Sequence, residues 1–129
     1  MDLKQIAKDT TKTLISYLTY RALKVVFEQL DETNPKRSYQ LHQFAARVSV
    51  QDGENFLRQL FSEDQELAFR ILTVREHLAI ELAEYLPEML RSTMQQVNME
   101  QRKQQLERMT QLNLSDPNST PEASDSEGS

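Results

Sequence analysis

Apolar side chains recur at helical spacing along a stretch that runs from Ser62 to about Leu112. Pro87 divides this stretch and is the only proline in it. Proline lacks an N–H and crowds the preceding turn, so we expect a kink there and no end of the helix. Ser62 followed by Gln65 matches a capping box, which predicts Ser62 as the N-cap of this helix. The apolar line comprises Leu67, Ile71, Val74, Leu78, Leu82 and Leu86, then Leu90, Met94 and Val97.

The length of this helix predicts a homodimer. About 50 residues at 1.5 Å each span roughly 75 Å, whereas a compact domain of this size has a radius of gyration of about 13 Å. The chain therefore cannot cover its own helix. Apolar side chains in the second half, which include Met89, Leu90, Met94 and Val97, would form an exposed stripe. Such a stripe usually marks an interface.

The N-terminal segment, from about Asp2 to Leu30, predicts a helix with two distinct lines of side chains. Asp2 and Gln5 form a capping pair at its start. One line is predicted to be buried: Ala7, Leu14, Leu18, Ala22 and Val25. The other mixes rings, hydroxyls and methyl groups: Ile6, Thr10, Thr13, Tyr17, Tyr20, Lys24 and Phe27. This mixture suits a groove that binds a peptide or another subunit. The alternative is that the tyrosines only rim the core.

The middle of the chain predicts two short helices, and the whole pattern predicts an all-α fold built as a small helical bundle. Asn34 and Pro35 mark the start of one helix, which ends at about Arg47. Residues 49–53 form a turn, and a third helix carries Phe56, Leu57, Leu60 and Phe61. We assign residues 1–114 to one helical dimerising domain. Residues 115–129 are rich in Ser, Pro and acids, so we predict a disordered tail without a role in folding.

Composition narrows the function classes. The 129 residues include no Cys, and the net charge is −5, but four of the 20 acids lie in the last fifteen residues. Residues 1–114 carry 16 acids and 15 bases, so we expect no nucleic-acid partner, which would need a basic face. No apolar run is long enough to span a bilayer and no signal pattern precedes the first helix, so we expect a cytoplasmic protein without a membrane partner.

Candidate catalytic chemistry is sparse. His77 has carboxylates nearby at Glu81, Glu84 and Glu88, but a di-iron bundle needs Glu-x-x-His twice, and residue 74 is Val. We interpret this region as a solvated face that also carries Arg75 and Glu76, and His42 as a surface or boundary residue. We therefore predict no enzyme, metal or cofactor, with a metal-binding bundle enzyme as a weak alternative.

The distal half of the long helix turns polar after Val97. Glutamines at 101, 104 and 105 surround Arg102 and Lys103. Amide and guanidinium groups suit reversible protein docking. The pattern fits equally well a helix that is made of good helix formers and has no partner.

Several segments together resemble RbcX, the family of cyanobacterial Rubisco assembly chaperones. They are Lys4–Thr10, Ser16–Tyr20, Glu32–Pro35, Arg70–Glu76, Leu86–Met89 and Leu106–Gln111, and the resemblance covers roughly residues 1–112. It implies an all-helical, boomerang-shaped homodimer, associated antiparallel along its long kinked helix. It also implies that a central groove clasps the extended C-terminal peptide of the Rubisco large subunit. The matching groove positions are Thr13, Tyr17, Tyr20, Val50 and Gln51.

The resemblance further implies a polar surface at each end of the dimer that touches the body of the large subunit. The matching positions are Gln29, Glu32, Asn34, Arg70 and Arg102. Arg70 and Arg102 are 32 residues apart, roughly 48 Å along a straight helix, so only an antiparallel dimer could bring them together. Such a chaperone promotes assembly of the large-subunit core until the small subunit displaces it, uses no nucleotide or cofactor, and acts in the cytoplasm in association with the carboxysome. The alternative is a helical dimerisation adaptor for another protein client.

Overall fold

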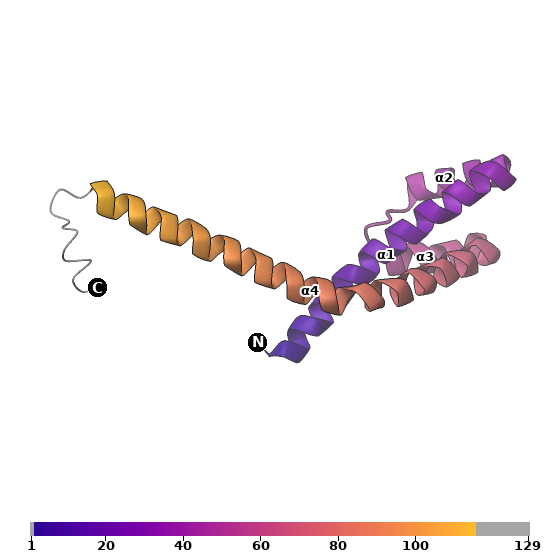
Figure 1. Cartoon of the computed structure of the whole chain (residues 1–129). Coiled ribbons are helices and arrows are strands. Elements are labelled where there is room, and N and C mark those ends of the chain that lie inside the picture. Colours follow the sequence, from indigo (N-terminus) through magenta and orange to yellow (C-terminus); the bar gives the residue numbers. More distant parts are fainter. Residues whose placement is uncertain (1, 116–129) are drawn as a thin grey trace. The chain divides into compact units, whose positions relative to one another are not determined.

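The computed structural model describes residues 2–115, which form four α-helices and no strand (Figure 1). These are α1 (Leu3–Thr33), α2 (Pro35–Arg47), α3 (Gly53–Glu63) and α4 (Gln65–Ser115). The all-α prediction is confirmed. Residues 116–129, which hold nearly all of the predicted disordered tail, lie outside the described residues.

The chain divides into two units, residues 1–84 and residues 85–129. The first unit contains α1, α2, α3 and the beginning of α4, and the second contains the rest of α4. The α4 helix continues through Pro87, which confirms that this proline does not end it. The kink at Pro87 stays a prediction.

Two helix starts follow the sequence prediction. The Asp2 carboxylate accepts the backbone N–H of Gln5 at 2.7 Å and caps α1. The Asn34 side chain accepts the backbone N–H of Arg37 at 3.2 Å and caps α2, with Pro35 at the first helical position. Because each cap satisfies an N–H group that has no partner within its helix, these residues fix where α1 and α2 begin.

The predicted N-cap of α4 was wrong by two residues. The α3 helix continues past Ser62 to Glu63, and Asp64 caps α4 by accepting the backbone N–H of Leu67 at 3.2 Å. Asp64 also forms an ion pair with Arg37 of α2, at 2.9 Å. This hydrogen bond raises the pKa of the Arg37 guanidinium, although partial burial opposes the shift. Asp and Ser are comparable N-caps, so the contact from a distant arginine favours Asp64.

Asp64→Ala is expected to lower the free energy of unfolding by about 1–2 kcal/mol, because it removes a helix cap and a partly shielded ion pair. Ser62→Ala is the matched control, and its expected cost is below about 0.5 kcal/mol, because Ser62 is exposed and caps no helix. Urea unfolding of both variants at one protein concentration measures the difference. An equal loss of unfolding free energy in the two variants would contradict the assignment of Asp64 as the N-cap.

One face of each of the four helices contributes buried side chains to the core of the first unit. Phe56 of α3 is fully buried and meets the ring of Phe44 of α2 edge to face, with centroids 5.2 Å apart. Ser38 of α2 is also buried, and its hydroxyl donates to the carboxylate of Asp31 on α1 at 2.5 Å. The buried apolar residues are Ala22, Leu23, Val26, Leu30, Leu41, Phe44, Phe56, Leu57, Leu60, Leu67, Ala68 and Ile71.

The predicted buried line of α1 was largely wrong. Of its five residues only Ala22 is buried, while Ala7 is exposed and Leu14, Leu18 and Val25 are partly exposed. The buried line of α1 comprises Thr19, Ala22, Leu23, Val26 and Leu30. Packing against α2 and α3 selects this face, and Thr19 is buried there because its hydroxyl has hydrogen-bond partners.

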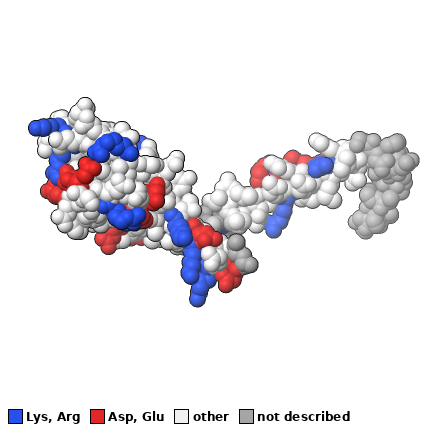
Figure 2. All heavy atoms as spheres, turned by 180° about the vertical axis from the view of Figure 1, so that it is seen from behind, with Lys and Arg blue, Asp and Glu red and all other residues white. Residues whose placement is uncertain are grey.

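The surface of the first unit carries both signs of charge. Figure 2 shows Lys and Arg side chains interspersed with Asp and Glu over the face in view. Within residues 2–115, none of the helices combines the length and the apolar character that crossing a membrane requires.

Candidate functional site

The five predicted groove residues lie around one hollow of the first unit, which we call the groove. It has a volume of about 500 Å³ and is lined by Thr13, Ser16, Tyr17, Tyr20, Val50 and Gln51. The first four come from α1 and the last two from the turn between α2 and α3. Positions 13, 16, 17 and 20 share one helix face, because three- and four-residue steps return to the same side. The sequence reasoning missed Ser16, which this spacing could have revealed.

The walls of this hollow combine aromatic surface with polar groups. The side chains of Tyr17 and Tyr20 are 70% and 54% exposed, so these rings face outward and do not belong to the core. The hydroxyl of Thr13 donates to the carbonyl of Asp9 at 3.2 Å, which orients its oxygen as an acceptor. An exposed amide at Gln51 completes the edge. Two rings beside a hydroxyl and an amide suit an extended peptide, whose side chains need apolar contact and whose backbone needs hydrogen bonds.

Four of the five predicted body-contact residues lie near one end of the first unit. Gln29 and Glu32 are exposed on the last turns of α1, Asn34 caps α2, and Arg70 is partly buried on α4. The α1–α2 junction and the α3–α4 junction lie at the same end (Figure 1). Ion pairs from Arg37 to Asp64 and Glu66 connect these two junctions. This end therefore presents polar groups from three helices.

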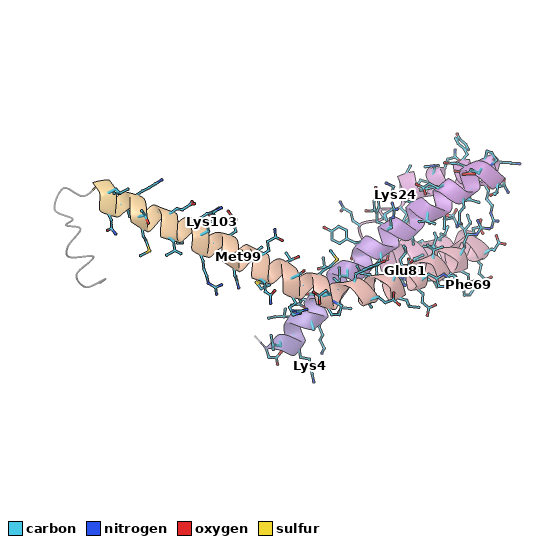
Figure 3. All side chains as sticks on the ribbon, in the orientation of Figure 1. Lys4, Lys24, Phe69, Glu81, Met99 and Lys103 are labelled. Carbon is cyan, nitrogen blue, oxygen red and sulfur yellow. The ribbon has the colours of Figure 1, made fainter. Side chains whose placement is uncertain are left out.

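The fifth predicted body-contact residue, Arg102, is exposed on the part of α4 in the second unit. Figure 3 labels its neighbours Met99 and Lys103, whose side chains extend from the helix. Every described side chain from residue 85 to residue 114 is exposed. This segment carries many apolar groups, and Met94 and Val97 are 53% and 49% exposed.

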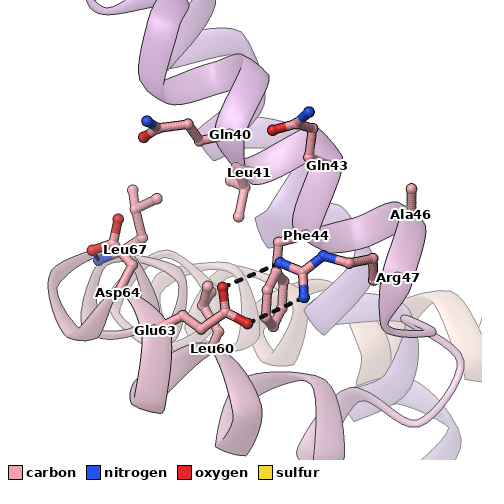
Figure 4. Close-up of a pocket in the computed structure, with 10 residues that line it drawn as sticks. All are labelled: Gln40, Leu41, Gln43, Phe44, Ala46, Arg47, Leu60, Glu63, Asp64 and Leu67. Carbon is pink, nitrogen blue, oxygen red and sulfur yellow. Dashed lines mark hydrogen bonds and ion pairs between the residues drawn. The ribbon is translucent and has the colours of Figure 1, made fainter.

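A second hollow, of about 580 Å³, lies between α2 and the α3–α4 junction (Figure 4). Its floor includes core residues such as Leu41 and Phe44, and an ion pair of 3.1 Å joins Arg47 to Glu63 across it. None of the predicted site residues lines this hollow. The charge of its arginine is already balanced by Glu63, and the hollow has no exposed aromatic rings comparable to those of Tyr17 and Tyr20.

The region around His77 differs from the predicted solvated face at one position. Glu76, His77 and Glu84 are exposed as predicted, but Arg75 is only 20% exposed and binds Thr19 and Glu54. Elsewhere, the exposed His42 stacks on the ring of Phe27 with centroids 3.8 Å apart. Among residues 2–115 there is no cluster of three His, Asp or Glu side chains that could hold a metal ion.

Comparison with known proteins establishes the family. The family model described as RbcX protein matches residues 1–111. This chain belongs to the RbcX family. The RuBisCO chaperone RbcX of Thermosynechococcus vestitus is 64% identical over 112 residues, which cover 87% of this chain and 89% of that protein. The RuBisCO chaperone RbcX of a Nostoc species is 62% identical over 117 residues, which cover 91% and 88%.

A solved RbcX structure has the same fold. The crystal structure described as RbcX in complex with substrate is 44% identical to this chain. The match has a TM-score of 0.71 and covers 85% of this chain and 99% of that one. The resemblance to RbcX seen in the sequence is therefore confirmed, both by the family match and by the fold.

Proposed function

We propose that this RbcX protein is a Rubisco assembly chaperone that acts as a homodimer. Its groove binds the C-terminal peptide of the Rubisco large subunit, and its polar ends contact the body of that subunit. It promotes assembly of the large-subunit core until the small subunit displaces it. It acts in the cytoplasm, in association with the carboxysome. Relatives named as RuBisCO chaperones support this proposal.

One observation carries the proposal. The hollow between α1 and the α2–α3 turn is lined by all five residues that match the peptide groove of the family. Tyr17 and Tyr20 supply exposed rings on which apolar side chains of the client can be buried. Thr13 and Gln51 supply polar groups for the client backbone. The site therefore binds an extended segment by two kinds of contact.

The homodimer is the second part of the proposal. The part of α4 beyond residue 84 exposes Met89, Leu90, Met94 and Val97, whose exposed fractions range from 49% to 68%. A helix with so much uncovered apolar surface gains stability by packing on another. In an antiparallel pair, a second copy covers this stripe, and Arg102 lies near the partner's Arg70. The two body-contact surfaces are then complete only in the dimer.

Sedimentation of the protein with a labelled synthetic C-terminal peptide of the large subunit tests both parts. At micromolar concentration the chain of 15.1 kDa is expected to sediment with roughly twice that mass, because a monomer leaves the apolar stripe in water. The peptide is expected to sediment with it, and a scrambled peptide of the same composition is the control. A stable, well-folded monomer would overturn the dimer, and equal binding of both peptides would overturn the groove.

A further inference from the structure

The α2–α3 turn, which carries Val50 and Gln51, is held against α1 at one close contact. Gly53, the buried first residue of α3, lies against the side chain of Thr19. A Cβ atom placed on Gly53 would lie 2.9 Å from Cγ2 of Thr19 and 3.2 Å from its Cβ. Carbon atoms in favourable contact are about 3.5–4.0 Å apart. Only glycine therefore allows α3 to begin so close to α1.

Thr19 is fixed on its polar side as well. Its side chain is 1% exposed, and its hydroxyl donates to the carbonyl of Ile15 at 2.8 Å. The same oxygen accepts a hydrogen bond from Nη1 of Arg75, on α4, at 3.0 Å. Because both bonds hold the hydroxyl, the methyl group of Thr19 cannot turn away from Gly53 without breaking them.

Arg75 also holds the start of α3. Its Nη1 lies 2.7 Å from a carboxylate oxygen of Glu54, the residue that follows Gly53. One guanidinium from α4 therefore binds α1 through Thr19 and α3 through Glu54. Both bonds flank the contact between Thr19 and Gly53, and bonds to a charged donor are stronger than neutral ones.

This arrangement borders the groove directly. Thr19 lies between Tyr17 and Tyr20 in the chain, and Gly53 follows Gln51 by two residues. A further hollow of about 410 Å³, lined in part by Thr19, Gly53 and Glu54, shares Ser16 and Gln51 with the groove. A shift of Gly53 would therefore move the turn that forms one wall of the groove.

We infer that Thr19, Gly53, Glu54 and Arg75 form a clamp that positions Val50 and Gln51 against Tyr17 and Tyr20 for client binding. This inference rests on the proposed function, because the groove is the site that the clamp shapes. Arg75 is a positioning residue, and it has no place in the groove lining. No residue of α4 lines the groove, and the clamp connects this helix to the groove through Arg75.

The first test compares two arginines that each bind a carboxylate of α3 from another helix. Arg75→Met removes the pair with Glu54, and the matched control Arg47→Met removes the pair with Glu63. Arg75→Met is expected to weaken binding of the synthetic large-subunit peptide by about five- to tenfold, since a loosened supporting contact misplaces a binding wall. Arg47→Met is expected to change it less than about twofold. Fluorescence anisotropy gives the affinities, and thermal unfolding monitors stability.

The second test uses the close contact itself. Gly53→Ala inserts a methyl group against Thr19 and is expected to weaken peptide binding about as much as Arg75→Met. Thr19→Ser removes Cγ2, the nearest atom, but keeps the hydroxyl and its two hydrogen bonds. The double variant Gly53→Ala with Thr19→Ser is therefore expected to recover most of the lost affinity. Such a non-additive result is the signature of two groups in direct contact.

A peptide-free measurement separates this inference from the proposed function. Backbone hydrogen exchange in residues 49–53 is expected to be faster in Arg75→Met than in Arg47→Met. Unchanged exchange, equal loss of affinity in both arginine variants, or no recovery with Thr19→Ser would each overturn the clamp. If the wild-type protein did not bind the peptide, the proposed function would fail, and the exchange experiment would still decide whether Arg75 holds the turn.

Discussion

Tyr20→Ala is expected to weaken binding of the free C-terminal peptide of the Rubisco large subunit by about 2–4 kcal/mol, the range of a buried aromatic anchor. The Tyr20 ring is 54% exposed in the unbound chain and lines the groove, so client side chains can be buried against it. Tyr17→Ala is expected to fall in the same range, because the Tyr17 ring lies on the same face of α1. The losses of binding free energy in the two variants need not add, since both rings contact the same bound segment.

Tyr39 provides the matched control for this prediction. It is a tyrosine of α2 that is 63% exposed and does not line the groove. Tyr39→Ala is expected to leave the peptide affinity within about twofold of the wild-type value. Isothermal titration of the three variants with one synthetic peptide measures all of these effects. Unchanged binding by Tyr20→Ala, or equal losses of affinity in Tyr20→Ala and Tyr39→Ala, would show that the peptide does not bind in the groove.

Arg102→Ala is expected to have the opposite pattern, with assembly of the large-subunit core lost and peptide binding kept. Arg102 is exposed on the second unit and has no part in the groove lining. Its guanidinium can form charge-assisted hydrogen bonds with the body of the client, and alanine cannot. The variant would therefore hold the client by its C-terminal segment without orienting its body for assembly.

Paired assays on the same preparations measure this division of labour. One is a peptide titration, and the other follows the large-subunit oligomer by native gel after refolding of the subunits. Lys103→Ala is the control, because it removes a neighbouring charge that points about 100° further round the helix. Loss of peptide binding in Arg102→Ala would show that the groove and the ends do not act separately.

The local features of this fold could be predicted from the spacing of residues in the sequence. The caps at Asp2 and Asn34 and the continuation of α4 through Pro87 depend on residues within a turn of one another. The line that contains Tyr17 and Tyr20 was visible because helical spacing places them on one face. Val50 and Gln51 came only from the family resemblance, since nothing in a short turn predicts which helix it contacts.

The errors concern residues whose partners are distant in the sequence. Asp64 replaces Ser62 as the cap of α4 because it also binds Arg37, 27 positions away. Thr19 belongs to the buried face of α1 because its hydroxyl binds Arg75, 56 positions away. Arg75 looked solvated because its neighbours along α4 are charged, but its partners Thr19 and Glu54 lie on other helices. A helical pattern contains no signal for such pairs.

Refolding of the cognate Rubisco large subunit with and without this protein shows whether the protein is an assembly chaperone. The wild-type dimer is expected to increase the yield of the assembled large-subunit core, and Tyr20→Ala is expected to reduce this yield. Addition of the small subunit is expected to release the dimer. An unchanged yield in the presence of a folded dimer that binds the C-terminal peptide would contradict the proposed chaperone function.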